Sequence, residues 1–423
     1  MKKVICCPPE RLPTRLDNEA LYLTMFSKSG RAGIGHIALG LPAAIRNAKL
    51  APSVQAWDFA VIASAVAATD KAVLRSQSPD GWTRKIDLHV CLADPAVWNA
   101  RRSELENMLR FLTGDFWSLR FRSGGIKPPK ATKPEKKNAD CVCLLSGGID
   151  SLVGSIELTD SGMKPLFVSQ VVRGDKNTQA KFASALGGSN RHYHWSFTAQ
   201  HPGEPEKSTR ARSIIFIAFA ALAAGALQSP NNQTVETIVV PENGFISLNV
   251  PLGPGRLGTL STKTTHPVFM SAVQSVWNAV GIQARLLYPY RFQTKGEMLQ
   301  RCPDSEKLAS LVGESTSCSR YQRYKLIHCG KCIPCLVRRA AFFEAQLPDT
   351  TAGGYLCDRL SRSESKDVIA AAVAYLRYQD EGIRRFVGSS VLFASHSERE
   401  LYEGVVARGM DELGRLLSSH GVI

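Results

Sequence analysis

The chain has 423 residues and a formal net charge of +15, from 52 Lys and Arg against 37 Asp and Glu. This length excludes a single small core and predicts two or three domains. A hydrophobic content of 44% with 21% charged residues is typical of a soluble globular protein, and the positive charge favours a polyanionic partner such as a nucleotide, a nucleic acid or an acidic protein.

The N-terminal residues are not expected to act as a secretory signal. Lys2 and Lys3 precede a short apolar run that Pro8 and Pro9 end. The longest apolar stretch, Ser213–Leu227, is too short to span a bilayer and is predicted to be a buried helix. Without an export signal, we expect the eleven cysteines to be thiols or metal ligands. The chain is therefore predicted to be cytoplasmic and to have no membrane partner.

Residues 1–122 mix strand-like and helix-like segments and show no internal repeat, which predicts an N-terminal accessory α+β domain. Lys85–Leu92 and Phe116–Phe121 alternate as half-buried strands do, and a helix is expected over Trp98–Leu112. The next segment, 123–139, is rich in lysine and proline and has no aromatic residue. This composition predicts an extended, self-repelling linker, with a nucleic-acid tether as the alternative.

Strand and helix patterns then alternate through residues 140–347. Strands are predicted at Cys141–Leu145, Pro165–Val172 and Val235–Val240, and helices at Asp150–Leu158, Thr178–Leu186 and Arg212–Leu227. This alternation predicts an α/β domain with a doubly wound parallel sheet.

Residues 348–423 are predicted to be a helical C-terminal region. Helices are expected at Lys366–Arg377 and Glu398–Leu417, with Ser397 and Glu400 placed as a capping box.

A glycine-rich loop, Ser146-Gly147-Gly148-Ile149-Asp150-Ser151, joins the first of these strands to the first helix. Glycines lack a Cβ atom, so their amides can approach an anion closely, and the helix start adds free N–H groups. Ser146 and Ser151 can donate hydroxyls to phosphate oxygens. Asp150 would be repelled by bare phosphate and is assigned to a Mg²⁺ ion that bridges the phosphates. The loop therefore predicts an ATP site, with a plain glycine turn as the alternative.

Four cysteines, Cys318, Cys329, Cys332 and Cys335, lie close together in the sequence. Four thiolates complete the tetrahedral shell of Zn²⁺ and leave no position for water, so the pattern predicts a structural zinc site. An iron–sulfur cluster and a redox-active pair are the alternatives, and Cys302 is the one cysteine that could replace a ligand.

The SGGIDS loop resembles the PP-loop of the ATP pyrophosphatases, which cleave ATP between the α and β phosphates. Together with Cys318 and the run CGKCIPC, it resembles the 7-cyano-7-deazaguanine synthase (QueC-like) family. Members of that family activate 7-carboxy-7-deazaguanine with ATP, add ammonia and form a nitrile. The resemblance implies a HUP-like fold over about residues 140–345 and a 7-deazaguanine-type substrate.

Two further segments resemble that family. They are Ala211-Arg212-Ser213, at the start of the long apolar helix, and Thr294-Lys295-Gly296-Glu297. Lys295 and Arg212 are therefore expected to act with Asp150 in catalysis by neutralising charge on the phosphates. Surface charges at a helix start and in a loop are the alternatives for these two residues.

Two segments depart from the family pattern, namely Pro241–Phe245 and Ser261–Pro267. Glu242 and Asn243 follow a strand at the usual ligand-binding edge and are expected to bind substrate. His266 either contacts substrate or caps a turn.

The longer layout, with ENGF and STKTTHP, resembles the QueC-like proteins of bacterial anti-phage systems, including the Qat type. That resemblance implies antiviral defence and a partner protein whose amine is the acceptor. A housekeeping, queuosine-related synthase that uses ammonia, and a nucleotide-sensing nucleic-acid-binding module, are the alternatives. A homodimer is a further possibility that the sequence does not decide.

Overall fold

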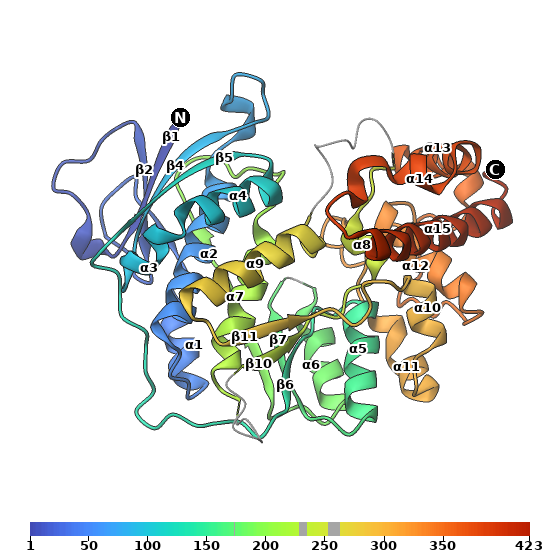
Figure 1. The fold of residues 1–423 in the computed structure, drawn as a ribbon, viewed down its shortest axis with the longest axis horizontal. Helices are drawn as coiled ribbons and strands as arrows, with labels where there is room; N and C mark the ends of the chain where they lie inside the picture. Colours follow the sequence, from blue (N-terminus) through green and yellow to red (C-terminus); the bar gives the residue numbers. More distant parts are fainter. Residues whose placement is uncertain (173, 228–234, 253–262) are drawn as a thin grey trace.

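The computed structural model describes residues 1–172, 174–227, 235–252 and 263–423 and contains two mainly parallel sheets with helices between and around them (Figure 1). In the described part of the chain, no helix combines the length and the hydropathy that crossing a bilayer requires.

The first sheet belongs to the N-terminal unit, residues 1–122, and has the strand order β5-β4-β1-β2-β3-β9. Its strands are β1 (Lys2–Cys7), β2 (Ala20–Met25), β3 (Gly35–Ile37), β4 (Lys85–Cys91), β5 (Phe116–Arg122) and β9 (Ala199–Gln200). Strands β1 to β5 pair in parallel, and β9, from later in the chain, pairs antiparallel with β3. The unit is thus α/β and not the α+β domain predicted from the sequence, because its strands are joined by crossovers and not by hairpins.

The helices of this unit are α1 (Leu41–Asn47), α2 (Val54–Ala72), α3 (Pro95–Ala100) and α4 (Arg102–Thr113), with 3-10 turns at Pro9–Arg11 and Arg75–Gln77. The predicted helix over Trp98–Leu112 is two helices, since Arg101 between them leaves the helical conformation (φ −112°, ψ 17°). Helix α2 is buried over most of its length. An apolar surface on every side marks a helix that is covered on every side.

The second sheet has the order β11-β10-β6-β7-β8 and is parallel throughout its described pairs. Its strands are β6 (Cys141–Leu144), β7 (Pro165–Gln170), β8 (His192–Trp195), β10 (Glu236–Val239) and β11 (Ala284–Leu287). Helices α5 (Ile149–Asp160) and α6 (Lys176–Ala185) lie on one face, and α7 (Arg212–Ala224) and α9 (Pro267–Val280) lie on the other (Figure 1). The predicted doubly wound parallel sheet is confirmed.

The two sheets repeat one topology, although the sequence shows no repeat. Numbered within its own unit, each has the order 5-4-1-2-3 for its five parallel strands. Helices α2 and α4 stand in the connections that α7 and α9 occupy in the second unit, and α2 packs on α7 while α4 packs on α9 (Figure 1). The units are therefore joined back to back through these helices and share one continuous hydrophobic core.

The lysine-rich segment between the units runs along the surface and is attached to both. The N–H groups of Ala131 and Glu135 donate to the carbonyls of Leu50 and Lys49, at 3.0 and 2.9 Å. Lys137 then forms a bridge to Leu227 after α7. Backbone hydrogen bonds hold this segment in place, although its composition predicts a free linker.

The remaining helices form a lobe beside the second sheet. They are α8 (Gly244–Leu248), α10 (Lys295–Gln300), α11 (Ser305–Leu311), α12 (Ile333–Glu344), α13 (Lys366–Glu381), α14 (Ile383–Val387) and α15 (His396–Ser419), with 3-10 turns at Val312–Glu314, Leu360–Arg362 and Gly388–Val391. Helices α8, α12, α13 and α15 share a separate core. Helix α15 is capped by Ser395, whose hydroxyl accepts from the Glu398 N–H at 3.4 Å. The predicted pair, Ser397 and Glu400, is wrong by two residues because the S-x-x-E pattern occurs twice in succession.

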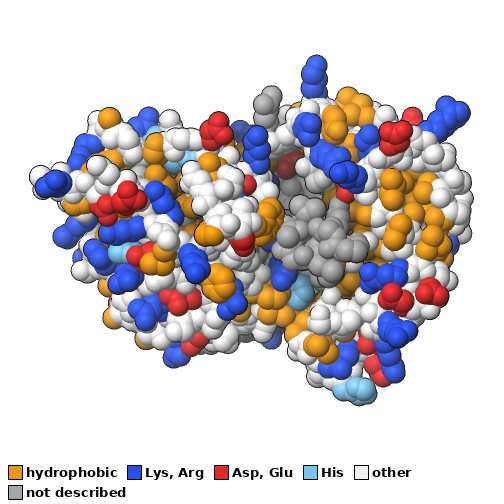
Figure 2. Space-filling model, turned by 90° about the horizontal axis from the view of Figure 1, so that it is seen from above, with side chains coloured by type: hydrophobic (Ala, Val, Ile, Leu, Met, Phe, Trp, Pro, Cys, Tyr) orange, Lys and Arg blue, Asp and Glu red, His pale blue; other side chains and the backbone are white. Residues whose placement is uncertain are grey.

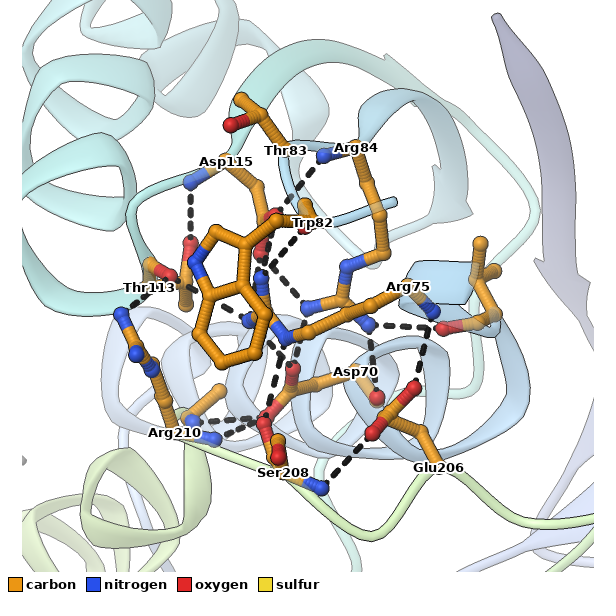
Figure 3. A network of polar contacts seen from close by, with 12 residues as sticks. Asp70, Arg75, Trp82, Thr83, Arg84, Thr113, Asp115, Glu206, Ser208 and Arg210 are labelled. Atoms are coloured by element: carbon orange, nitrogen blue, oxygen red, sulfur yellow. Dashed lines mark hydrogen bonds and ion pairs between the residues drawn. The ribbon is translucent and has the colours of Figure 1, made fainter. Parts of the chain in front are cut away.

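A buried polar network joins the N-terminal unit to the start of α7 (Figure 3). Asp70 of α2 accepts hydrogen bonds from the N–H groups of Arg210 and Ala211, at 2.6 and 2.8 Å. Arg84 donates to Asp70 and, at 2.6 Å, to Asp115. Each of these side chains is almost fully buried, so each charge depends on its partners.

We predict that Asp70→Asn lowers the free energy of unfolding by about 3–5 kcal/mol, because the buried Arg84 then loses one of its two carboxylates. Urea denaturation measures this loss. The matched control is Glu104→Gln, which removes an exposed ion pair with Arg101 and should change stability little. Equal stability of the two variants would contradict the role given to the network.

Candidate active site

The glycine loop joins β6 to α5 at the carboxyl end of the central strand. Gly147 has φ +90°, a conformation that side chains with a Cβ atom rarely adopt. The Ser146 hydroxyl accepts from the Gly148 N–H at 3.3 Å and donates to the Ser151 hydroxyl at 3.1 Å. The first turn of α5 follows this loop directly, and the N–H groups of a first helical turn have no partner within the helix, the arrangement that binds phosphates.

Asp150, in the first turn of α5, forms a buried ion pair with Lys295, the first residue of α10. Asn243 donates to the other oxygen of this carboxylate through its side chain, at 2.7 Å, and through its backbone N–H, at 3.2 Å. Burial alone would raise the pKa of Asp150, but the Lys295 ammonium and the hydrogen bonds from Lys295 and Asn243 hold it below its ordinary value. Asp150 is thus an ionised, fully partnered carboxylate.

Glu242 brings a second carboxyl group to the same place. It follows β10 and contacts Asp150, and burial, followed by the charge of Asp150, raises the pKa of Glu242 to about 8. The site therefore holds one ionised and one protonated carboxyl group at neutral pH.

A cavity of about 200 Å³ opens above these groups. Its lining combines the glycine loop, the end of β10, the start of α10 and the cysteine segment, and includes Ser146, Gly148, Asp150, Glu242, Lys295, Thr316 and Pro334. The fold brings these separate segments together at the point where strand order reverses between β6 and β10, which is the usual ligand site of such sheets.

The four predicted cysteines form one buried cluster whose Sγ atoms all lie within 4.8 Å of one another. The Sγ atoms of Cys329 and Cys335, and those of Cys332 and Cys318, are 3.9 Å apart. A ZnS₄ tetrahedron with bonds of ~2.3 Å has edges of about 3.8 Å, so the cluster fits this ion. Cys302 lies elsewhere, in the core around α5 and α10.

The cysteine segment also forms one wall of the phosphate site. The Thr316 N–H donates to the Gly147 carbonyl at 2.9 Å. Arg338 of α12, which is fully buried, donates to the carbonyls of Ser315 and Val312, at 3.0 and 3.1 Å. The segment that contains the cysteine cluster therefore supports the glycine loop through the hydrogen bond from Thr316 to Gly147.

The other predicted residues lie around this centre. Arg212 is exposed at the start of α7, near Asp175, whose burial raises its pKa while Thr316 and Arg212 oppose the shift. His266 caps α9 by accepting from the Val268 N–H at 3.2 Å, and its ring packs against Phe393. Ser261 and Thr262 of the predicted substrate segment lie outside the described residues.

Sequence reasoning missed one residue that supports Lys295 from outside the site. Glu412 of α15 is 4% exposed and accepts a hydrogen bond from the Thr294 hydroxyl. Thr294 and Glu297 form the capping box that begins α10. A Cβ atom on Gly296 would lie 2.6 Å from the Glu412 carboxyl, so glycine is needed here. The C-terminal helix thereby positions the start of α10 and with it Lys295.

Comparison with known proteins agrees with the motifs. The chain is 27% identical over 179 residues to the 7-cyano-7-deazaguanine synthase of Paracoccus denitrificans, covering 37% of this chain and 73% of that protein. It is 36% identical over 135 residues to the synthase of the same name from Rhizobium leguminosarum, covering 28% of this chain and 55% of that protein. No protein-family model matches the chain. The predicted resemblance to the 7-cyano-7-deazaguanine synthase family is confirmed, and the anti-phage branch stays a prediction.

We predict one zinc ion per chain, measured by elemental analysis. Cys332→Ser should yield aggregated or protease-sensitive protein, because a structural zinc ion contributes directly to folding. Cys302→Ser, outside the cluster, should keep the metal and the fold. Iron in the wild-type protein, or a well-folded and metal-free Cys332→Ser variant, would contradict a structural zinc site.

A second prediction concerns pH. Burial is the main cause that raises the pKa of Glu412 from 4.5 to about 7, so the unfolded chain releases this proton at lower pH than the folded one. Stability from this group is therefore full below pH 4.5 and falls by up to about 3 kcal/mol as pH rises through 7.

Glu412→Gln should remove this loss of stability at high pH, and the glutamine still offers an acceptor to the Thr294 hydroxyl. Melting temperatures at pH 5 and pH 8 test this, and the gap between them should narrow in the variant. Glu306→Gln, an exposed site on α11, is the control and should keep the wild-type gap. An unchanged difference in melting temperature between pH 5 and pH 8 in Glu412→Gln would show that Glu412 is already ionised at pH 5 in the folded protein.

Proposed function

We propose that this chain uses ATP to activate the carboxylate of a 7-deazaguanine-type substrate and transfers the acyl group to an amine. The observation that carries the proposal is the buried Asp150–Lys295 pair at a phosphate-type glycine loop, covered by the cysteine segment. The names of the two similar proteins support the substrate class. Because one match covers only 55% of the relative, activity and substrate are both part of the proposal.

The chemistry consists of two substitutions. A carboxylate oxygen attacks the α-phosphorus of ATP and pyrophosphate leaves, which gives an acyl adenylate. An amine nitrogen then attacks the acyl carbon, AMP leaves and the nitrogen loses a proton. A free carboxylate is a poor electrophile, and the adenylate supplies the leaving group that it lacks.

The residues of the site suit the first step. The amides of Gly147 and Gly148 would bind phosphate oxygens, and Lys295 would neutralise charge that grows on the pyrophosphate. Asp150 offers ionised carboxylate oxygens, the ligands that Mg²⁺ prefers, and Glu242 would offer a second carboxylate once the ion displaces its proton. Such an ion, when bound, would supply further positive charge to the phosphates. Arg212, at the exposed start of α7, could meet phosphate oxygens at the rim.

The finer proposal is an anti-phage role in which the acceptor is an amine of a partner protein. The match to the Paracoccus synthase covers 37% of this chain, and the remaining residues offer surfaces that a partner protein could contact. Helix α13 exposes Ile369, Val373 and Leu376 along one side, and apolar side chains gather on that lobe in Figure 2. An exposed apolar strip of this kind favours a protein partner.

Two alternatives remain as outcomes of the test. A synthase that uses ammonia and releases a nitrile is favoured by the names of the relatives. A nucleic-acid-binding role receives less support, since Lys and Arg side chains on the face in Figure 2 are scattered among acidic and apolar ones. Nucleic-acid binding sites usually gather such charges in one patch.

The deciding experiment incubates the protein with ATP, Mg²⁺ and 7-carboxy-7-deazaguanine and measures pyrophosphate and AMP. We expect release that depends on the deazaguanine, and Asp150→Asn should reduce it at least about 100-fold, because Lys295 and the metal both lose their anionic partner. Asp160→Asn, at the exposed far end of the same helix, should be active. ADP as the product, or full activity of Asp150→Asn, would overturn the proposal.

Mass spectrometry of the same reactions identifies the acceptor. A mass increase on a co-expressed partner protein supports the protein-amine route, whereas free nitrile formed from ammonia supports the housekeeping route. Full-length protein is needed, because deletion of residues 1–122 would expose the buried faces of α7 and α9.

A further inference from the structure

A larger cavity, of about 640 Å³, adjoins the phosphate site. It lies between α9, the end of β11 and the start of α15, and its lining includes Met270, Leu286, Tyr288, Phe393, Glu398 and Tyr402. Glu242 lines both this cavity and the smaller one. The two cavities therefore meet at Glu242, beside Asp150 and Lys295.

The position of the large cavity follows from the sheet. The phosphate loop stands at the carboxyl end of β6, and the cavity stands at the carboxyl ends of the neighbouring strands β10 and β11. Ligands of doubly wound sheets lie along this edge. A molecule whose carboxylate is activated beside Lys295 would extend its remaining atoms along β10 and β11, into this cavity.

The walls suit a flat heterocycle. Apolar side chains of α9 and β11 form one side, and the rings of Phe393 and Tyr402, with centroids 5.3 Å apart, form another. Cavities of 300–1,000 Å³ with apolar walls and a few polar groups are typical of small-molecule sites. The volume also leaves space beside a single base for an incoming amine.

Tyr288 and Glu398 are polar residues in the lining of this cavity. The Tyr288 hydroxyl is buried and has no hydrogen-bond partner among the described residues, a costly state that a ligand would relieve. Glu398, in the first turn of α15, is 39% exposed and is held by Arg291 at 3.4 Å and by the Ser395 hydroxyl at 3.2 Å. Gln274 also lines the cavity, but its amide already makes three hydrogen bonds within α9 and to β11.

We propose that this cavity binds the deazaguanine base of the substrate, an inference that rests on the proposed function. A guanine-type ring presents adjacent N–H donors on one edge, which a carboxylate accepts in paired hydrogen bonds. Glu398 is the acceptor for that edge, and the Tyr288 hydroxyl donates to the ring carbonyl oxygen. The C-terminal lobe, through Phe393, Glu398 and Tyr402, thereby forms half of the base site.

Two variants test the assignment. Tyr288→Phe and Glu398→Gln should each raise the KM for 7-carboxy-7-deazaguanine about tenfold in pyrophosphate exchange, since each loses one hydrogen bond to the base. The KM for ATP, the zinc content and the melting temperature should stay at wild-type values. Glu400→Gln, on the solvent side of the same helix with 63% of its side chain exposed, is the matched control and should behave as wild type.

A binding measurement separates this inference from the proposed function. Unsubstituted 7-deazaguanine lacks the carboxylate, so calorimetry with it reports the base site without turnover. Binding to wild type that both variants weaken about tenfold supports the base site, even if no pyrophosphate exchange occurs and the proposed function fails. Exchange in wild type with unchanged KM and unchanged 7-deazaguanine affinity in both variants would overturn the base site and leave the proposed function standing.

Discussion

The buried Asp150–Lys295 ion pair is the interaction on which the site depends. Two charges removed from water are stabilising only when geometry and further hydrogen bonds are well satisfied. Here α5 presents Asp150, α10 presents Lys295, and Asn243 after β10 completes the carboxylate's hydrogen bonds. The capping of α10 depends in turn on Glu412, 118 residues from Thr294 along the chain. Phosphate chemistry at this loop therefore requires the sheet and the C-terminal lobe to be folded together.

Buried charge also connects the N-terminal unit to the second sheet. Asp70 accepts hydrogen bonds from the N–H groups at the start of α7, and it forms an ion pair with Arg84 of the first unit. With α2 packed on α7 and α4 on α9, the N-terminal unit is part of the scaffold that supports the phosphate site. Any contact that it makes with a partner protein would be a second role for this unit.

Short motifs were predictable from the sequence, and contacts between distant segments were not. The glycine loop and the four cysteines are local patterns whose chemistry needs those residues at that spacing. The orientation of helix α2 could not be predicted from its sequence because its apolar residues are spread over all sides of the helix. The shared topology of the two sheets could not be predicted because the sequence shows no internal repeat. Glu412 reads as an ordinary acidic residue of a surface helix until tertiary packing brings it to Thr294.

The back-to-back arrangement of the two units has a consequence for how the chain is made. Helix α4 ends at Thr113, but α7 ends only at Ala224, which is 224 − 113 = 111 residues later. At about 5–20 residues per second, a ribosome needs roughly 6–22 s to bridge that gap. Throughout that interval α2 lacks the helix that covers it, and α4 lacks its cover for longer, until α9 ends at Val280. Chaperone supply and translation speed across this stretch should accordingly govern the yield of soluble protein.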